Sequence, residues 1–207
     1  MRIDKLTTSF QQALGAAQSV AVGKDNANLD PLHVLHALIS EDEFGAKSLL
    51  LRSGGNVNKL HQLVDDAIEK LPKLNNPSGE LSASSDLQRI FNLTDKEAQK
   101  RGDDFIASDL FLYTLCEDKC AAGKLMHQTG LSKKNLGAAL DYVRGGKSQN
   151  SPEQRQDSDT ISKYMIDVTE KAEAGSLDPV IGRDDEIRRC IQILQRRTKN
   201  NPVLIGE

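Results

Sequence analysis

The feature that most constrains the fold is an internal repeat. Residues 10–39 align with residues 87–116 at a constant offset of 77, without a gap. Ten aligned pairs are apolar in both copies and recur at spacings of three, four and seven residues, the pattern of the buried face of an amphipathic helix. The sequence therefore predicts two similar units of four helices each. The ten pairs are Phe10/Leu87, Ala13/Ile90, Leu14/Phe91, Ala16/Leu93, Ala21/Ala98, Leu29/Ile106, Val34/Phe111, Leu35/Leu112, Leu38/Leu115 and Ile39/Cys116.

Helix boundary signals divide each copy in a similar way. Asp30 is a good N-cap, and Pro31 follows at the first helical position, where its missing N–H costs nothing. Other capping residues, glycines and a proline mark the remaining boundaries. In chain order we expect a helix from about Asp4 to Val22, an end at Gly54-Gly55, a cap at Asn56, a stop at Pro72, a cap at Ser84 or Ser85, an end at Gly102, a start at Ser108, an end at Gly130, and a helix over Ser132–Arg144 before Gly145-Gly146.

Composition narrows the fold and the class of partner. Aromatic residues are only 4% of the chain, with no Trp, which favours an all-α fold over a sandwich or a barrel. The net charge of −3 gives no basic footprint for nucleic acid. No apolar run is long enough to span a membrane, and no signal peptide is recognisable. Three cysteines are too few for a disulfide framework. We therefore expect a cytoplasmic protein that binds neither nucleic acid nor membrane.

The composition changes after the second copy. Residues 145–159 contain no apolar side chain, so this stretch cannot bury enough surface to offset its chain entropy. The predicted organisation is a repeat domain over 1–146 (repeat 1 about 6–71, repeat 2 about 83–146), a flexible linker over 147–158, and the start of another domain over 159–207. In that last part we expect a helix over Asp184–Arg196 and a buried strand over Val203–Ile205.

The last part also carries a resemblance to a known family. Its end, DPVIGRDDEIRRCIQILQRRTKNNPVLIGE, resembles the start of the first ATPase module of the Clp/heat-shock-hundred AAA+ unfoldases. The opening MRIDKLTTSFQQAL, the doubled helical repeat and the segment KYMIDVTEKAEAGSLDPVIGRDDEIRR resemble the ClpB-type disaggregases of this family. The resemblance covers essentially the whole chain. It implies that residues 159–207 are the incomplete α/β start of an AAA+ module, ending at the beginning of the first Walker A motif.

A phosphate-binding loop needs a glycine-rich turn followed by Lys and Ser or Thr, between a strand and a helix. Here the sequence ends after what would be the first glycine of that turn, so we expect the chain as given to be no enzyme and to hold no cofactor. In the intact parent the resemblance implies ATP with Mg²⁺. The partial ATP site that it implies comprises Val180, Ile181, Gly182, Gly206 and Glu207.

The resemblance implies a non-catalytic capture role for the repeat domain. It would bind unfolded or aggregated polypeptides for an ATP-dependent chaperone that disaggregates and unfolds stress-damaged proteins with the Hsp70 system. The seam between two helical units is a natural groove. The residues carried over from the family are Leu93 and Leu110 as an apolar wall, with Thr7, Asp103 and Asp109 as a polar rim. Glu97 and Asp109 depart from the side chains expected there, which predicts a shorter or more polar groove. The chain alone is expected to be monomeric and the parent a homo-hexamer.

Two other functions stay open on the sequence. The chain could be the adaptor-docking N-domain of a protease-linked Clp unfoldase, or a free-standing helical scaffold. No metal site is predicted, because His33 and His36, at i, i+3, lack a further ligand at a recognisable spacing and are better interpreted as a surface or boundary pair. Cys116 and Cys120 lie one helical turn apart, and Cys116 aligns with Ile39, which indicates a small core residue.

Overall fold

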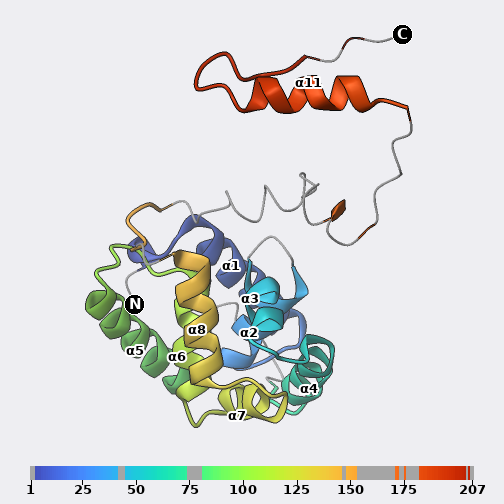
Figure 1. Cartoon of the computed structure of the whole chain (residues 1–207). Helices are drawn as coiled ribbons and strands as arrows, with labels where there is room; N and C mark the ends of the chain where they lie inside the picture. The colour runs from blue at the N-terminus through green and yellow to red at the C-terminus, as the bar shows by residue number, and fades with distance from the viewer. Residues whose placement is uncertain are drawn as a thin grey trace. The chain divides into compact units, whose positions relative to one another are not determined.

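The computed structural model describes residues 3–41, 45–73, 81–145, 148–152, 171–172, 175, 182–203 and 205. The chain divides into two compact units, Met1–Thr160 and Ile161–Glu207, which are treated separately below. Figure 1 shows the first unit as a bundle of helices. Its elements are η1 (Ile3–Lys5), α1 (Thr8–Gly23), β1 (Asn28–Leu29), α2 (Pro31–Ser40), α3 (Ala46–Arg52), α4 (Val57–Glu69), β2 (Ser82–Ala83), α5 (Ser85–Arg101), α6 (Ser108–Glu117), α7 (Ala121–Gln128) and α8 (Lys133–Arg144).

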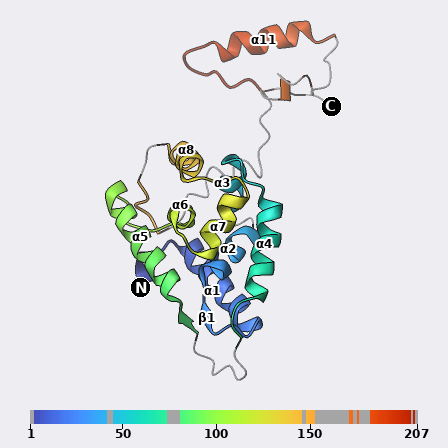
Figure 2. The same ribbon diagram turned by 90° about the horizontal axis from the view of Figure 1, so that it is seen from below.

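The order of elements confirms an all-α fold built from two four-helix units. Helices α1–α4 form repeat 1, and α5–α8 form repeat 2. The central helices are α2 and α6, which contact each other and most of the remaining helices (Figure 2). Cross-repeat packing also joins α3 to α8 and α4 to α7. The two repeats therefore share one hydrophobic core and do not form two independent bundles.

The predicted helix ends are largely confirmed. The Asp30 side chain accepts from the backbone N–H of Leu32, and Asn56 and Ser132 cap α4 and α8. Ser84, not Ser85, caps α5. The first helix is shorter than predicted: it begins at Thr8, because residues 3–5 form a separate 3-10 turn and the residues after it pair with repeat 2.

The core keeps the predicted duplication. Both members are buried in nine of the ten aligned apolar pairs. The exception is Ala16/Leu93, where Leu93 leaves 42% of its surface exposed. Three aromatic rings, Phe10, Phe91 and Phe111, contact one another at the centre and join the repeats. The centroid of the Phe10 ring lies 5.9 Å from that of Phe91 and 5.2 Å from that of Phe111, and the centroids of Phe91 and Phe111 are 5.3 Å apart. Aromatic contacts of this kind add stability beyond simple area burial.

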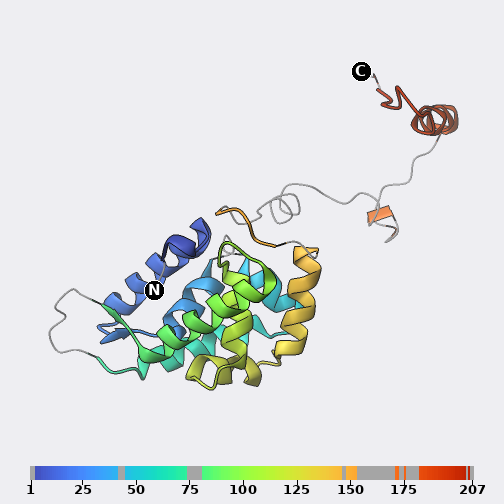
Figure 3. The same cartoon turned by 90° about the vertical axis from the view of Figure 1, so that its left-hand side faces the viewer.

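The two repeats exchange backbone hydrogen bonds reciprocally. The N–H of Thr7 donates to the carbonyl of Ile106 at 3.0 Å, and the N–H of Ser84 donates to the carbonyl of Leu29 at 2.9 Å. These pairs correspond under the 77-residue offset. Strands β1 and β2 form a short parallel pair, and Leu6 makes a matching bridge to Ile106. The β1–β2 pair lies at the opposite end of the unit from α8 (Figures 2 and 3).

Part of the predicted linker is tied to the repeat domain. The N–H of Gln149 donates to Oδ1 of Asp103 at 2.8 Å, and the N–H of Thr8 donates to the carbonyl of Pro152 at 2.9 Å. Such hydrogen bonds are invisible to composition, because they depend on polar groups that the fold presents. Residues 148–152 therefore pack on the domain, although their sequence predicts a flexible segment.

In the second unit, the described residues contain one long helix, α11 (Asp184–Leu194). This agrees with the predicted helix except that it ends two residues earlier. Its apolar side chains Ile187, Ile191 and Leu194 are exposed. The predicted strand is wrong for the residues described: Val203 and Ile205 have no regular structure and are 81% and 93% exposed. A strand needs a hydrogen-bonding neighbour, and none lies among the described residues of this unit. Among the helices that the structure describes, none has the length and apolar character needed to span a bilayer.

Candidate functional site

Repeat 2 carries an open groove of about 600 Å³. Its lining comes from α5, from α6 with the two residues that follow it, and from the first residue of α8. We call this the α5–α6 groove. Its lining residues are Arg89, Leu93, Lys96, Glu97, Lys100, Tyr113, Thr114, Glu117, Asp118, Lys119 and Lys133.

Leu93 and Tyr113 give the α5–α6 groove its apolar surface. Leu93 is the aligned apolar residue that the core does not bury. The Tyr113 ring is contacted by two cations, with Cζ of Arg101 5.0 Å and Nζ of Lys133 5.2 Å from its centroid. Cation–π contacts hold a ring in place while leaving one edge available. An exposed leucine beside a fixed aromatic ring is suited to contact an apolar side chain of a ligand.

The rim of the groove is charged and internally paired. Arg89 donates to both carboxylate oxygens of Asp118, at 3.0 and 2.7 Å, and this hydrogen bonding lowers the pKa of Asp118. Lys133 pairs with Glu117, which raises the pKa of Lys133. Glu97, one of the predicted departures, pairs with Arg101 at 3.2 Å. Counted together, the lining holds five cationic and three acidic side chains, so the rim is weakly positive.

The structure does not bring the five predicted substrate residues into one surface. Leu93 lines the α5–α6 groove, but Leu110 is fully buried in the core and Thr7 is fully buried just before α1. The hydroxyl of Thr7 has no hydrogen-bond partner among the described residues. Neither Leu110 nor Thr7 presents surface to a ligand in this conformation. A family resemblance identifies these positions but does not show whether their side chains are buried or exposed in this chain.

Asp103 and Asp109 instead hold an arginine that the sequence analysis missed. Arg144, at the end of α8, donates to Oδ2 of Asp103 at 2.5 Å and to both oxygens of Asp109 at 2.8 and 2.9 Å. Burial acts to lower the pKa of Arg144, but the hydrogen bonds and charges of Asp109 and Asp103 raise it above its ordinary value. Because the side chain of Asp103 is completely buried, this cluster is structural in character.

Repeat 1 has a counterpart groove of about 530 Å³, lined by Val20, Gly23, Lys24, His36, Asp65, Ile68 and Glu69. We call it the α1–α2 groove. Three of its positions correspond to lining positions of the α5–α6 groove under the 77-residue offset: Val20 to Glu97, Gly23 to Lys100 and His36 to Tyr113. The duplicated fold therefore places two hollows at equivalent sites with different chemistry.

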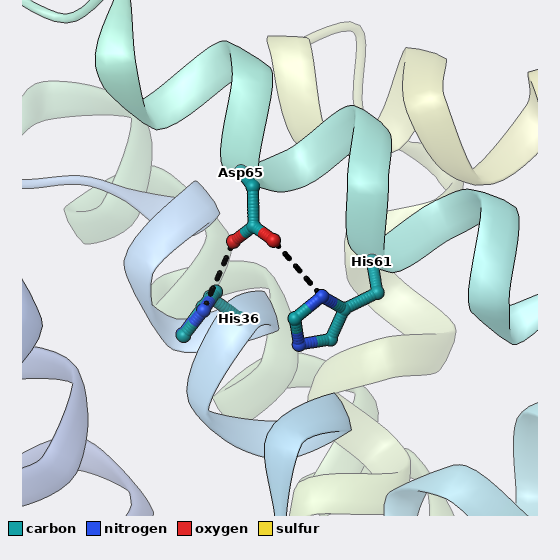
Figure 4. Close-up of side chains that lie close together, drawn as sticks. All are labelled: His36, His61 and Asp65. Carbon is teal, nitrogen blue, oxygen red and sulfur yellow. Dashed lines mark ion pairs between the residues drawn. The ribbon is translucent and has the colours of Figure 1, made fainter.

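The histidines do not form the predicted surface or boundary pair. His33 is fully buried: the N–H of Asp30 donates to its Nδ1 at 2.9 Å, and its Nε2 lies 2.9 Å from Oδ1 of Asn26. Burial lowers the pKa of His33 to about 4. His36 is half-buried, and burial lowers its pKa as well. His36 instead meets His61 and Asp65 of α4, which the sequence analysis did not single out (Figure 4).

Two further groups of predicted residues have different outcomes. Cys116 is buried in the core, as predicted, and Cys120 is also buried. Both are free thiols, and burial raises the pKa of each to about 11. Of the predicted ATP-site residues, Val180, Ile181, Gly206 and Glu207 lie outside the described residues. Gly182 is described as exposed, with a positive φ of 75°.

Comparison with protein families identifies the family of the repeat domain. The model of the Clp repeat (R) N-terminal domain matches residues 5–129. A chaperone protein ClpB from Pseudomonas putida is 46% identical over 207 residues. That alignment covers 100% of this chain and 24% of the relative, so the chain spans about a quarter of the length of the curated relative.

Solved structures show the same fold. The N-terminal domain of Hsp104 from Candida albicans superposes with a TM-score of 0.64 at 24% identity, covering 72% of this chain and 97% of that one. A ClpV N-domain in complex with a VipB peptide superposes with a TM-score of 0.51 at 15% identity, covering 72% and 92%.

Proposed function

This chain belongs to the Clp repeat N-terminal domain family and is ClpB-type in sequence, and from that premise we propose that its repeat domain captures polypeptide for a disaggregating chaperone. The ligand is an extended, partly apolar segment of an unfolded or aggregated protein. The observation that carries the proposal is the α5–α6 groove, where exposed Leu93 and the Tyr113 ring lie inside a charged rim. The ClpV N-domain that shares this fold is known in complex with a peptide.

The proposed ligand follows from the shape and chemistry of the groove. It is open to solvent and combines apolar with charged lining residues, which suits a chain that is bound by a few apolar contacts. Burying two or three Leu-sized side chains yields about 4–8 kcal/mol, and association costs at least about 4 kcal/mol. The expected affinity is therefore weak, with a Kd of roughly tens of micromolar to millimolar. Weak binding allows the segment to be passed on.

The activity of the whole protein is also part of this proposal. The ClpB relatives are about four times as long as this chain. By analogy with them, the intact protein would be a cytoplasmic homo-hexamer that uses ATP with Mg²⁺ and cooperates with the Hsp70 system. Part of its ATP site would be formed by Val180, Ile181, Gly182, Gly206 and Glu207. In that arrangement the repeat domain binds and the ATPase modules supply the work.

The test is a titration of the 207-residue chain with a reduced, carboxymethylated model protein, followed by fluorescence anisotropy. We expect a saturable signal that weakens about tenfold in the variant Leu93→Gln. The matched control is Val22→Gln, which changes another exposed apolar residue, 52% exposed and outside both grooves. Leu110 is unsuitable for this purpose because a buried glutamine would disrupt the core. Equal binding by Leu93→Gln and the native chain would rule out the α5–α6 groove.

A further inference from the structure

A cluster of three side chains lies at the α1–α2 groove, and two of them, His36 and Asp65, line it. His36 extends from α2, and His61 and Asp65 extend from α4, one turn apart, so that three ligand-bearing side chains converge (Figure 4). Nε2 of His36 lies 3.1 Å from Oδ1 of Asp65, and Nδ1 of His61 lies 3.0 Å from Oδ2. All the potential ligand atoms lie within 4.8 Å of one another.

We propose that His36, His61 and Asp65 bind a divalent transition-metal cation, with Zn²⁺ the ion of first choice. Two imidazoles and one carboxylate form a common donor set for Zn²⁺ and neighbouring first-row metals. In a tetrahedral zinc site with bonds of about 2.0–2.1 Å, adjacent donor atoms lie roughly 3.3 Å apart. The two short nitrogen–oxygen distances here are close to that spacing, so small side-chain rotations suffice to admit an ion.

Ser40 supplies the outer contacts that such a site requires. Its Oγ donates to the carbonyl of His36 at 2.8 Å, which leaves the oxygen free to accept. The same Oγ lies 3.2 Å from Nε2 of His61 and 3.5 Å from Nδ1 of His36. When these two nitrogens carry the protons, the lone pairs of the opposite nitrogens face Asp65. Hydrogen bonds to the far nitrogen fix the tautomer of metal-binding histidines in this way.

The position of the cluster leaves room for the rest of a coordination sphere. The side chains of His36, His61 and Asp65 are 20%, 37% and 47% exposed, so an ion can enter from solvent. The adjoining groove of about 530 Å³ has room for water molecules as further ligands. Lys24, the cation on this groove wall, is paired with Glu69, which offsets its repulsion of an incoming metal.

The site also bridges two helices of repeat 1. An ion held by α2 and α4 would cross-link them and stabilise the folded state by mass action, because no such site exists in the unfolded chain. In repeat 2 the residue that corresponds to His36 is Tyr113, which offers no comparable nitrogen ligand. The metal site lies in repeat 1 and is independent of the polypeptide capture proposed for repeat 2.

The experiment is a Zn²⁺ titration of metal-free 207-residue chain against a chromophoric chelator at neutral pH, in a Cys190→Ser background that removes the half-exposed thiol. We expect one ion per chain and a higher melting temperature with Zn²⁺. Affinity should fall at least about tenfold in His61→Ala and in Asp65→Asn, and about tenfold in Ser40→Ala. The control is His127→Ala, which removes an exposed histidine outside the cluster.

Co²⁺ provides a second readout that does not depend on folding stability. The Co²⁺-loaded chain should show visible absorption typical of low-coordinate nitrogen and oxygen ligation, and the Asp65→Asn variant, which is close in shape to the native residue, should lose it. Zinc binding that is unchanged in both His61→Ala and Asp65→Asn, or that disappears in His127→Ala, would overturn the proposal, as would a native chain that binds no ion.

Discussion

The two repeats bury nearly the same apolar side chains but satisfy their buried polar groups differently. In repeat 1 the buried pair at the corner between α1 and α2 is neutral, with Asn26 bonded to His33. The corresponding residues of repeat 2 are Asp103 and Leu110, and there Asp103 forms an ion pair with Arg144. The duplicated core therefore fixes the backbone, whereas each copy uses its own polar residues at the same corner.

The same difference extends to the surface hollows. At equivalent positions, the α1–α2 groove has Val20 and His36, and the α5–α6 groove has Glu97 and Tyr113. The first hollow is suited to a metal ion and the second to a polypeptide segment. The difference in surface chemistry between the repeats is thus concentrated where the two copies disagree in sequence.

The largest expected effect comes from breaking the charged corner of repeat 2. The variant Arg144→Met leaves the buried carboxylate of Asp103 without its cation, and removing one partner of a buried pair costs about 3–5 kcal/mol of unfolding free energy. Urea denaturation measures this loss. The control Lys73→Met removes an exposed cation paired with Glu69 and should leave the free energy of unfolding almost unchanged. A loss below about 1 kcal/mol for Arg144→Met would show that the ion pair does not support the corner.

The neutral Asn26–His33 pair of repeat 1 should make stability depend on pH. The pKa of His33 is about 4 in the folded chain and 6.5 when unfolded, so the unfolded state takes up a proton that the folded state refuses. This contribution is complete above pH 6.5 and is lost as pH falls toward 4, by up to about 3 kcal/mol. The variant His33→Leu, which copies repeat 2, should reduce the slope of unfolding free energy against pH in this window. Parallel slopes for the two chains would contradict the assignment.

A smaller contrast concerns the residues that precede the first helix of each repeat. Ser84 caps α5 by accepting from the N–H of Leu87 at 3.2 Å, whereas its counterpart Thr7 makes no capping hydrogen bond. Ser84→Ala should cost about 1 kcal/mol. Thr7→Val should cost nothing or stabilise slightly, because it removes a buried hydroxyl that is unpaired among the described residues. Thermal unfolding of both variants measures the difference, and a loss for Thr7→Val would indicate a hidden partner.

The periodic apolar residues predicted much of the fold, for a physical reason. Burial of a stripe such as Phe10, Ala13 and Leu14 fixes which face of a helix turns inward, and the local caps Asp30 and Asn56 fix where helices begin. Neither signal shows which helices become neighbours. The reciprocal pairing of Leu6 with Ile106 was therefore not predictable from local sequence.

The candidate sites depended on the same missing information. Leu93 and Leu110 were both predicted from the family resemblance; Leu93 does line a groove, but Leu110 lies in the core. Arg144 and His61 were missed because their partners come from other helices. The spacing of His61 and Asp65, at i, i+4 on one helix, was the available signal. Only the packing of α4 on α2 brings His36 to them.

The most direct test of the central claim maps where polypeptide binds. Amide chemical shifts of the ¹⁵N-labelled 207-residue chain would be followed while an unfolded peptide containing leucine and phenylalanine is added. Our account predicts that the largest shifts fall on residues of the α5–α6 groove, around Leu93, Tyr113 and Lys133, with little change around Val20 and His36. Shifts centred on the α1–α2 groove, or no shifts at millimolar peptide, would contradict it.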